Sequence, residues 1–401
     1  MRTGLDRQSS RPIDDAIRTY LVSSRLGRPI LRSKESVRAL ARAVRMMRRY
    51  FEVDGIPIGD RCSFLALSSA QCQCEMLLGD AGDTMVLDAG LVDFLHAANS
   101  LAATSAPQSE GANFAIAAEQ LGLAALHHRD YIAAINCKVA ALSWGKEFDR
   151  LNWRSRDMRR LLDMQTTFLV LHEMYHWALD KSEALRRISD HLYNSGFQDH
   201  LCAAVRAQLS PEAVRKHAPK FDLTDEDIAR HADLAEEAVR WVQSRQEELT
   251  CDFLALRVLM LDVRSPYLAS RAVYAGATMN SILDVHASMV DLASGASPGN
   301  HAQRRRERAA QARYFVYAAM PGSVAIAGNS EVDSSIYQGL YTRYLENSII
   351  PICAARDVLW TMQMDGELVP AGVKPEELDY CWRTAKNAFD IDDDGVPMRL
   401  I

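Results

Sequence analysis

The sequence contains the pattern His-Glu-x-x-His at residues 172–176, which combines side chains that can bind a metal ion with one that can move a proton. In an α-helix, residues four apart lie on the same face, so the imidazoles of His172 and His176 could bind one Zn²⁺. Glu173 lies beside them and is placed to accept a proton from water rather than to bind the metal. The pattern therefore predicts Zn²⁺ as the cofactor, His172 and His176 as ligands, and Glu173 as a general base.

A catalytic zinc usually has three protein ligands and one open position, so a third ligand is needed. The metzincin class is excluded, because Leu179 and Ser182 stand where that class has glycine and histidine. Further along the chain, Glu248 and Asp252 are four residues apart in a helical stretch and share one face. We expect Glu248 to be the third ligand and Asp252 to accept the ring N–H of a ligating histidine. Glu247 is the alternative to Glu248.

The residues around the first motif are typical of a buried helix. Phe168–Leu171 are apolar without interruption, and no glycine or proline lies between Asp157 and Lys181. A helix that is apolar on most sides is expected inside a protein. The two histidines are therefore expected on a buried helix that spans residues 155–181.

The rest of the chain also reads as mainly helical. Short apolar runs at residues 63–67 and 84–87 indicate strands of a small sheet, and residues 104–112 read as a loop. We expect an α+β fold that is mainly α, with a small sheet and an extended helical part. The further predicted helices span residues 114–142, 184–209, 225–261, 268–294, 301–319 and 335–361.

With Glu248 and Asp252 in the pattern Glu-x-x-x-Asp on a second helix, the chain resembles the gluzincin metallopeptidases, especially the type that includes CAAX prenyl proteases and heat-shock membrane proteases. It also resembles the soluble phage-exclusion peptidases of bacteria, through His-Glu-x-x-His and the general layout. The alanine usual before the aspartate is Cys251 here, which replaces one small side chain by another. The resemblance covers at most residues 160–310, and it implies a zincin-like core that hydrolyses peptide bonds.

The resemblance has two further implications. In gluzincins a strand at the edge of the sheet pairs with the extended substrate, and Thr84–Asp88 is similar to that strand. His301, followed by the basic run Arg304–Arg306, is loosely similar to a histidine-containing segment that comes after the ligand helix in the family, although the proline that follows this histidine is missing here. The similarity implies that His301 stabilises the oxyanion or contacts the substrate.

Composition limits the class of protein. Of the 401 residues, 48% are hydrophobic and 24% are charged, which excludes a mainly disordered or collagen-like chain. No apolar run reaches the roughly 18 residues of a membrane span, and residues 1–34 hold no apolar block of signal-peptide length. The eight cysteines are too widely spread for a disulfide framework. These features predict a cytoplasmic protein without a membrane span.

Charge divides the chain unevenly. Residues 1–60 carry thirteen Lys and Arg against seven Asp and Glu, although the whole chain has a net charge of −6. Arg38, Arg42, Arg45 and Arg49 recur at helical spacing, which indicates either a solvated helix face or a surface for an acidic partner. The negative total argues against nucleic acid as a partner. The expected regions are a basic helical N-terminal region at 1–61, a zincin-like catalytic domain at 62–320 and a helical C-terminal extension at 321–401.

Together these patterns predict a soluble zinc metallopeptidase that acts on a protein or peptide substrate. A peptidase used as a regulated toxin or anti-phage effector would share the same chemistry. The alternative is a non-catalytic helical protein that zinc stabilises and that binds a partner through its basic N-terminal helix.

Overall fold

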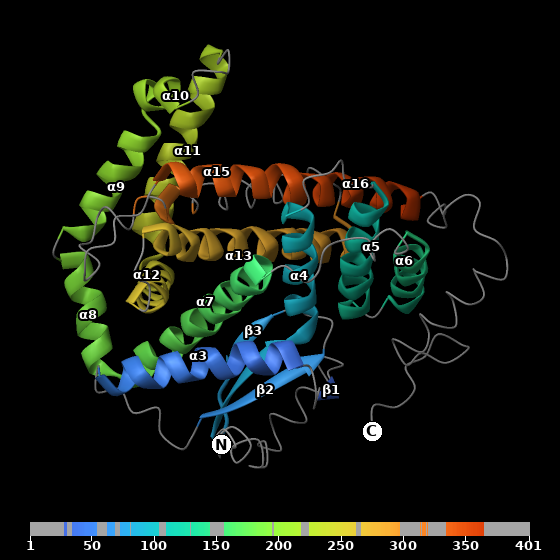
Figure 1. Cartoon of the computed structure of the whole chain (residues 1–401), viewed down its shortest axis with the longest axis horizontal. Coiled ribbons are helices and arrows are strands. Elements are labelled where there is room, and N and C mark those ends of the chain that lie inside the picture. The colour runs from blue at the N-terminus through green and yellow to red at the C-terminus, as the bar shows by residue number, and fades with distance from the viewer. Residues whose placement is uncertain are drawn as a thin grey trace.

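The chain folds into many helices and one small sheet, as the sequence predicts (Figure 1). The computed structural model describes residues 28–29, 34–53, 62–68, 73–80, 82–103, 110–128, 130–144, 156–194, 196–217, 224–261, 266–296, 313, 315–317, 319 and 334–364. The fold class is therefore α+β, mainly α.

The sheet has four strands in the order β1-β2-β4-β3. β2 and β4 are parallel, whereas β1 and β3 pair antiparallel with their neighbours. Every residue of β4 is buried, which is typical of a strand covered on both faces. The strands are β1 (Arg28–Pro29), β2 (Cys62–Ser68), β3 (Cys74–Leu77) and β4 (Asp83–Asp88).

The predicted edge strand at Thr84–Asp88 is wrong, because β4 lies between β2 and β3 and has pairing partners on both sides. The edge next to β4 is β3, a four-residue strand that was not predicted from the sequence, and the other edge is β1. After Leu77, Gly82 N–H donates to the Gly79 carbonyl, and β4 then pairs back along β3. A strand as short as β3 gives little periodic signal, so its position follows only from the pairing.

The described helices and helical segments are α3 (Lys34–Val53), α4 (Ala89–Ala103), α5 (Glu110–His127), α6 (Tyr131–Trp144), α7 (Arg156–Lys181), α8 (Glu183–Asn194), α9 (Phe197–Gln208), α10 (Pro211–His217), α11 (Asp225–Ser244), α12 (Gln246–Leu261), α13 (Pro266–Ala293), α15 (Ser334–Tyr344), the π-helical segment η2 (Leu345–Ile349) and α16 (Ile350–Met364). Helix α3 contains the basic arginine pattern, and Arg42 forms an exposed ion pair of 3.0 Å with Asp163 of α7.

Helix α7 runs through the centre of the molecule and contacts α3, α4, α12, α13 and β3. Its residues Phe168–Leu171 are almost completely buried, which confirms the expected buried helix. At Gly276 of α13 a Cβ atom would lie 3.3 Å from Cε2 of Phe168, so only glycine allows this close approach without displacement of a neighbour. Trp177 ties α7 to the sheet, because its Nε1–H donates to Asp83 Oδ2 of β4 at 2.7 Å.

Three of the predicted helices are each divided in two. The segment 114–142 is interrupted before α6, where the Asp130 carboxylate caps the new helix by accepting a hydrogen bond from Ala133 N–H. The segment 184–209 is interrupted at Gly196, whose φ of 78° is a left-handed conformation that favours glycine. The segment 225–261 is interrupted at Arg245, between α11 and α12. Of the segment 301–319, the described residues are helical.

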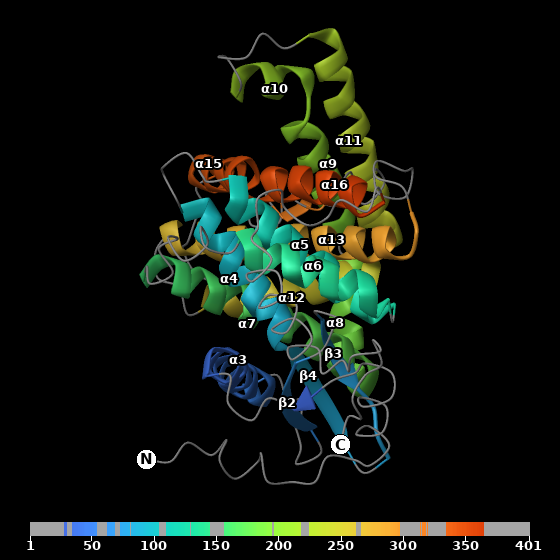
Figure 2. The same cartoon turned by 90° about the vertical axis from the view of Figure 1, so that its right-hand side faces the viewer.

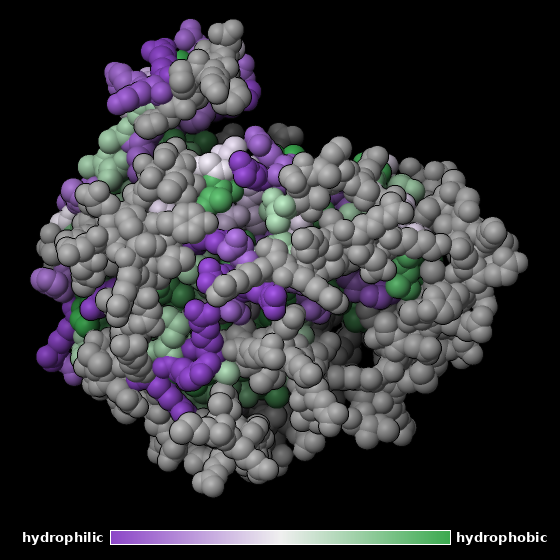
Figure 3. All heavy atoms as spheres, in the orientation of Figure 1, coloured by the Kyte–Doolittle hydropathy of each residue, from purple (hydrophilic) through white to green (hydrophobic). Residues whose placement is uncertain are grey.

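Helices α8–α11 form an arm that lies in the sequence between α7 and α12. The arm begins with α8 near the level of the sheet, and its far end, at α10 and the adjoining part of α11, projects on the side away from the sheet (Figures 1 and 2). Its projecting end, at α10 and α11, is mainly hydrophilic (Figure 3), which fits the exposed Glu212, Arg215 and Lys216. Although the arm separates α7 and α12 in the sequence, these two helices pack directly against each other.

One continuous hydrophobic cluster includes residues of α3, α7 and α16. The N-terminal region, the proposed catalytic region and the C-terminal helices therefore share a core. The division of the chain at residues 61 and 320 stays a prediction.

Candidate metal centre

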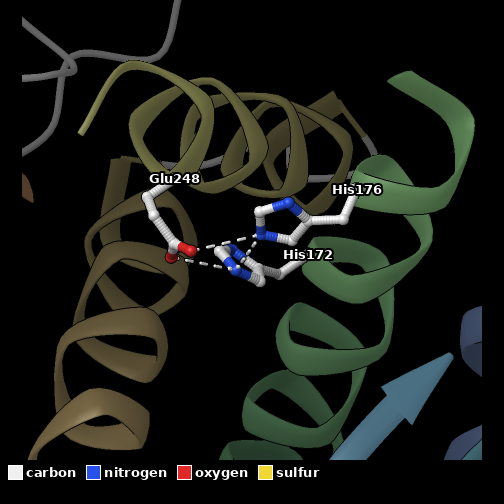
Figure 4. A group of neighbouring side chains, drawn as sticks. All are labelled: His172, His176 and Glu248. Atoms are coloured by element: carbon white, nitrogen blue, oxygen red, sulfur yellow. Dashed lines mark hydrogen bonds and ion pairs between the residues drawn. The ribbon is translucent and has the colours of Figure 1, made fainter. Parts of the chain in front are cut away.

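Two turns of α7 bring His172 and His176 together. Their ring centroids are 4.8 Å apart, and their Nε2 atoms are 3.1 Å apart. His172 is buried, whereas His176 is partly exposed. Both Nε2 atoms point to the same space between α7 and α12 (Figure 4).

Glu248, in the first turn of α12, reaches the same space from the opposite side (Figure 4). Its carboxylate oxygens lie 3.5 Å from the Nε2 atom of His172 and 3.5 Å from that of His176. One ligand atom from each of these three residues lies within 4.8 Å of the others, so the group could hold a metal ion. A hydrogen bond from His172 holds the pKa of Glu248 below its ordinary value against the opposing effect of partial burial, which keeps the carboxylate ionised.

Asp252 supports His172 from behind. This carboxylate is fully buried one turn after Glu248, and its Oδ1 lies 2.8 Å from His172 Nδ1. Burial opposes protonation of His172, but the Asp252 carboxylate outweighs burial and raises the pKa of the ring to about 9. The contact is the one expected for a carboxylate that accepts the ring N–H of a ligating histidine.

Arg313 holds Asp252 in its turn. Its Nη2 and Nε atoms donate to Asp252 Oδ2 at 2.7 and 3.0 Å. The guanidinium also lies 5.1 Å from the ring centroid of Trp241 and 5.8 Å from that of Tyr317, within the range of cation–π contacts. Burial alone would raise the pKa of Asp252, but Arg313 and His172 outweigh burial and hold it below its ordinary value.

Neither Arg313 nor Tyr317 was identified from the sequence. Tyr317 interacts with Asp252 through a side-chain hydrogen bond, and its hydroxyl accepts a hydrogen bond from Asn280 Nδ2 at 2.6 Å. The sequence holds one signal for this pair, since Arg313 and Tyr317 are four residues apart and share a helix face. That spacing alone does not show that the face is turned toward Asp252.

Glu247 takes a different position from Glu248. Its Oε1 lies 2.6 Å from His176 Nδ1, on the outer side of the ring, and its side chain is 65% exposed. Each imidazole thus has a carboxylate at Nδ1, Asp252 for His172 and Glu247 for His176. In the neutral ring, a proton held on Nδ1 beside a carboxylate leaves a free electron pair on Nε2, the atom that faces the common space.

Glu173, next to His172 on α7, borders a cavity of about 430 Å³. Burial raises the pKa of this carboxyl, although the neighbouring His172 and His176 oppose the effect. A carboxyl with a raised pKa next to a metal-binding group is suited to accept and return a proton.

The structure therefore brings together four of the residues predicted from the sequence, namely His172, His176, Glu248 and Asp252, with Glu173 on the same helix. His301 lies outside the described residues, and so do Ser297–Asn300.

No known protein family, curated protein or solved structure matches the chain. None of the helices in the described part of the chain combines the length and the apolar character that a membrane span requires.

Proposed function

We propose that the chain is a zinc-dependent metallopeptidase. The observation that carries the proposal is the convergence of His172, His176 and Glu248 on one point. Ligand atoms bound at about 2.0–2.1 Å to a tetrahedral Zn²⁺ are about 3.3 Å apart. The two Nε2 atoms are 3.1 Å apart, and each lies 3.5 Å from a different oxygen of Glu248, which is close to that spacing. Imidazole nitrogen and carboxylate oxygen are also the donor set that catalytic zinc prefers.

The protonation of His172 links the metal-free site to a metal-bound one. Asp252 beside Nδ1 raises the pKa of His172 to about 9, so the metal-free ring is protonated at neutral pH and its Nε2 faces the Glu248 carboxylate. Metal binding by histidine requires the neutral ring, so a metal ion at this position would replace the Nε2 proton. Asp252 would then keep the ring oriented with Nε2 toward the metal.

The number of ligands favours catalysis over a structural role. A structural zinc usually has four protein ligands, whereas a catalytic zinc has three and an open position. In the described part of the chain, three residues form the group. When bound, Zn²⁺ would polarise the scissile carbonyl and lower the pKa of water.

Glu173 would carry out the proton transfers. Its carboxylate would accept a proton from the attacking water and then give it to the leaving amine. The raised pKa of Glu173 suits both steps, since a carboxylate that binds a proton more strongly takes it from water more readily. A non-catalytic zinc site has no need for such a group at this position.

An extended substrate could pair with β3. This strand is at an edge of the sheet, contacts α7, and begins at Cys74, which lines the cavity next to Glu173. Peptide binding by strand addition uses main-chain hydrogen bonds and is therefore compatible with many sequences.

The test combines metal analysis with proteolysis by the full chain. We expect about one zinc per chain, and new peptide termini when an unstructured protein is incubated with the parent and analysed by mass spectrometry. Glu173→Gln should retain zinc and lower turnover by about 10²–10⁴-fold. The matched control is Glu212→Gln, an exposed site on α10. Equal turnover of the parent and Glu173→Gln would refute the mechanism. Unfolding on chelation with no cleavage by the parent would instead support the non-catalytic alternative.

A further inference from the structure

Trp241 lies at the base of the arm, in the last turn of α11, where the chain passes from the arm to α12. Arg245 N–H donates to the Trp241 carbonyl oxygen at 3.0 Å, and α12 begins one residue later with Glu248 in its first turn. Figure 1 shows this path, with α11 leading from the projecting end of the arm back to α12. The Trp241 side chain is partly buried and packs against the main hydrophobic cluster. It therefore belongs to the junction between the arm and the body of the molecule.

The indole of Trp241 lies against the guanidinium of Arg313, whose Cζ atom is 5.1 Å from the ring centroid. A cation is attracted to the face of an aromatic ring at this distance, and tryptophan attracts it most strongly. The second ring near Arg313 is that of Tyr317, at 5.8 Å. Tyr317 follows Arg313 by one helical turn, so of these two rings only that of Trp241 comes from a separate element.

Arg313 lies near two carboxylates that have different roles. Its Nη2 atom is 2.7 Å from Asp252 Oδ2 and 3.7 Å from Glu248 Oε2. The contact with Asp252 holds the carboxylate that orients His172. A closer approach to Glu248 would instead pair the guanidinium with an oxygen that the metal needs. The position of this one cation therefore affects both a ligand and the support of another ligand.

Two effects of the Trp241 ring favour the position of Arg313 at Asp252. The arginine side chain is long and has many rotamers, and stacking on a ring restricts the guanidinium. The ring also replaces water on one side of the ion pair, and opposite charges attract more strongly where water is excluded. An aliphatic side chain would exclude water but would not attract the cation, so the aromatic face is the property that matters.

We propose, on the basis of the zinc site proposed above, that Trp241 is a positioning residue of the metal centre. By its contact with Arg313 it holds the guanidinium at Asp252 and leaves the Glu248 carboxylate to the metal. The three residues of the metal-binding group come from α7 and α12, so the arm supplies none of them. Through Trp241 the arm still contributes to the geometry of the group.

The first measurement is the zinc affinity of the full chain, obtained by competition with a chromophoric chelator. Trp241→Leu should weaken zinc binding by about tenfold, the lower end of the range for loss of a group that supports a ligand. Trp241→Tyr and Trp241→Phe keep an aromatic face and should lie between the parent and Trp241→Leu. They fill more of the same space, so they keep the comparison decisive if Trp241→Leu does not fold. Trp144→Leu is the matched control, because Trp144 is also partly buried but contacts the ring of Phe114 rather than a cation.

The second measurement separates positioning through Arg313 from a general effect on the fold. In an Arg313→Met background, Trp241→Leu should have no further effect on zinc affinity, because the cation on which the ring acts is gone. The visible absorption of the Co²⁺-loaded protein reports the geometry of the ligands. Trp241→Leu should change this spectrum, whereas Trp144→Leu should not.

Three results would overturn the inference. They are zinc binding by Trp241→Leu as tight as that of the parent, an equal loss in Trp144→Leu, and a loss that persists in the Arg313→Met background. None of these measurements depends on turnover. If the aromatic series follows the expected order but the parent cleaves no peptide, the positioning role of Trp241 is supported and the peptidase is refuted. A parent that cleaves peptides while Trp241→Leu binds zinc as the parent does would refute only the positioning role.

Discussion

The buried pair of Asp252 and Arg313 provides the most demanding test of how the metal centre is built. Asp252→Asn keeps an oxygen that can accept the His172 Nδ1 proton, but it removes the negative charge. Arg313 would then be a largely buried cation without its partner at 2.7 and 3.0 Å. The change therefore separates the charge of Asp252 from its hydrogen-bonding role.

The expected magnitudes follow from the burial of the pair. Removing one partner of a buried ion pair typically costs about 3–5 kcal/mol, because the other charge is left uncompensated. Loss of a group that orients a ligating histidine typically lowers metal affinity by about 10–100-fold. Arg313→Met should lower stability to a similar extent, since it leaves the Asp252 carboxylate without its main cation. The double variant Asp252→Asn/Arg313→Met should be more stable than the sum of the single changes predicts, by about 2–3 kcal/mol.

The assay measures two quantities for each variant. Urea unfolding of the chelated protein gives the free energy of unfolding, and competition with a chromophoric chelator gives the affinity for zinc. Glu247→Gln is a matched control, because it is also a carboxyl-to-amide change at a group that lies against a histidine Nδ1. With its side chain 65% exposed, it should change stability by less than about 1 kcal/mol.

Two results would refute this reasoning. Additive stability losses in the double variant would mean that Asp252 and Arg313 are not coupled. An equal loss of zinc affinity in Asp252→Asn and Glu247→Gln would mean that burial of the Asp252 network contributes nothing to the orientation of His172.

Two further predictions concern stability. The chelated protein should lose up to about 3 kcal/mol of stability as the pH rises from 6.5 to 9. Folding raises the pKa of His172 from 6.5 to about 9, so protonation of this ring stabilises the folded state fully below pH 6.5, and this stabilisation is lost as the pH rises to 9. Urea unfolding at both pH values measures this loss, and stability that is constant or rises with pH would contradict it. Trp177→Phe should lower stability by about 1–3 kcal/mol, since the buried Asp83 loses the hydrogen bond from the indole N–H. Trp144→Phe, on the partly buried face of α6, is the comparison, and an equal change in urea midpoint would assign no role to the Asp83 contact.

The features of the site that residue spacing predicts are local. The spacing of His172 and His176, the apolar run before them and the absence of a helix breaker are sufficient to place two imidazoles on one face of a buried helix. The spacing of Glu248 and Asp252 similarly places two carboxylates on one face of another helix. These relations depend on the 3.6-residue period of a single helix, which residue order alone defines.

How these faces meet depends on the packing of separate helices. The packing of α12 on α7 directs Glu248 to the two Nε2 atoms and Glu247 to the outer side of His176, although the two glutamates are adjacent in sequence. The contact of Arg313 with Asp252, the edge position of β3 and the cavity beside Glu173 likewise depend on how separate elements pack. Helical periodicity shows which side chains share a face, but it contains no information about the element that the face contacts.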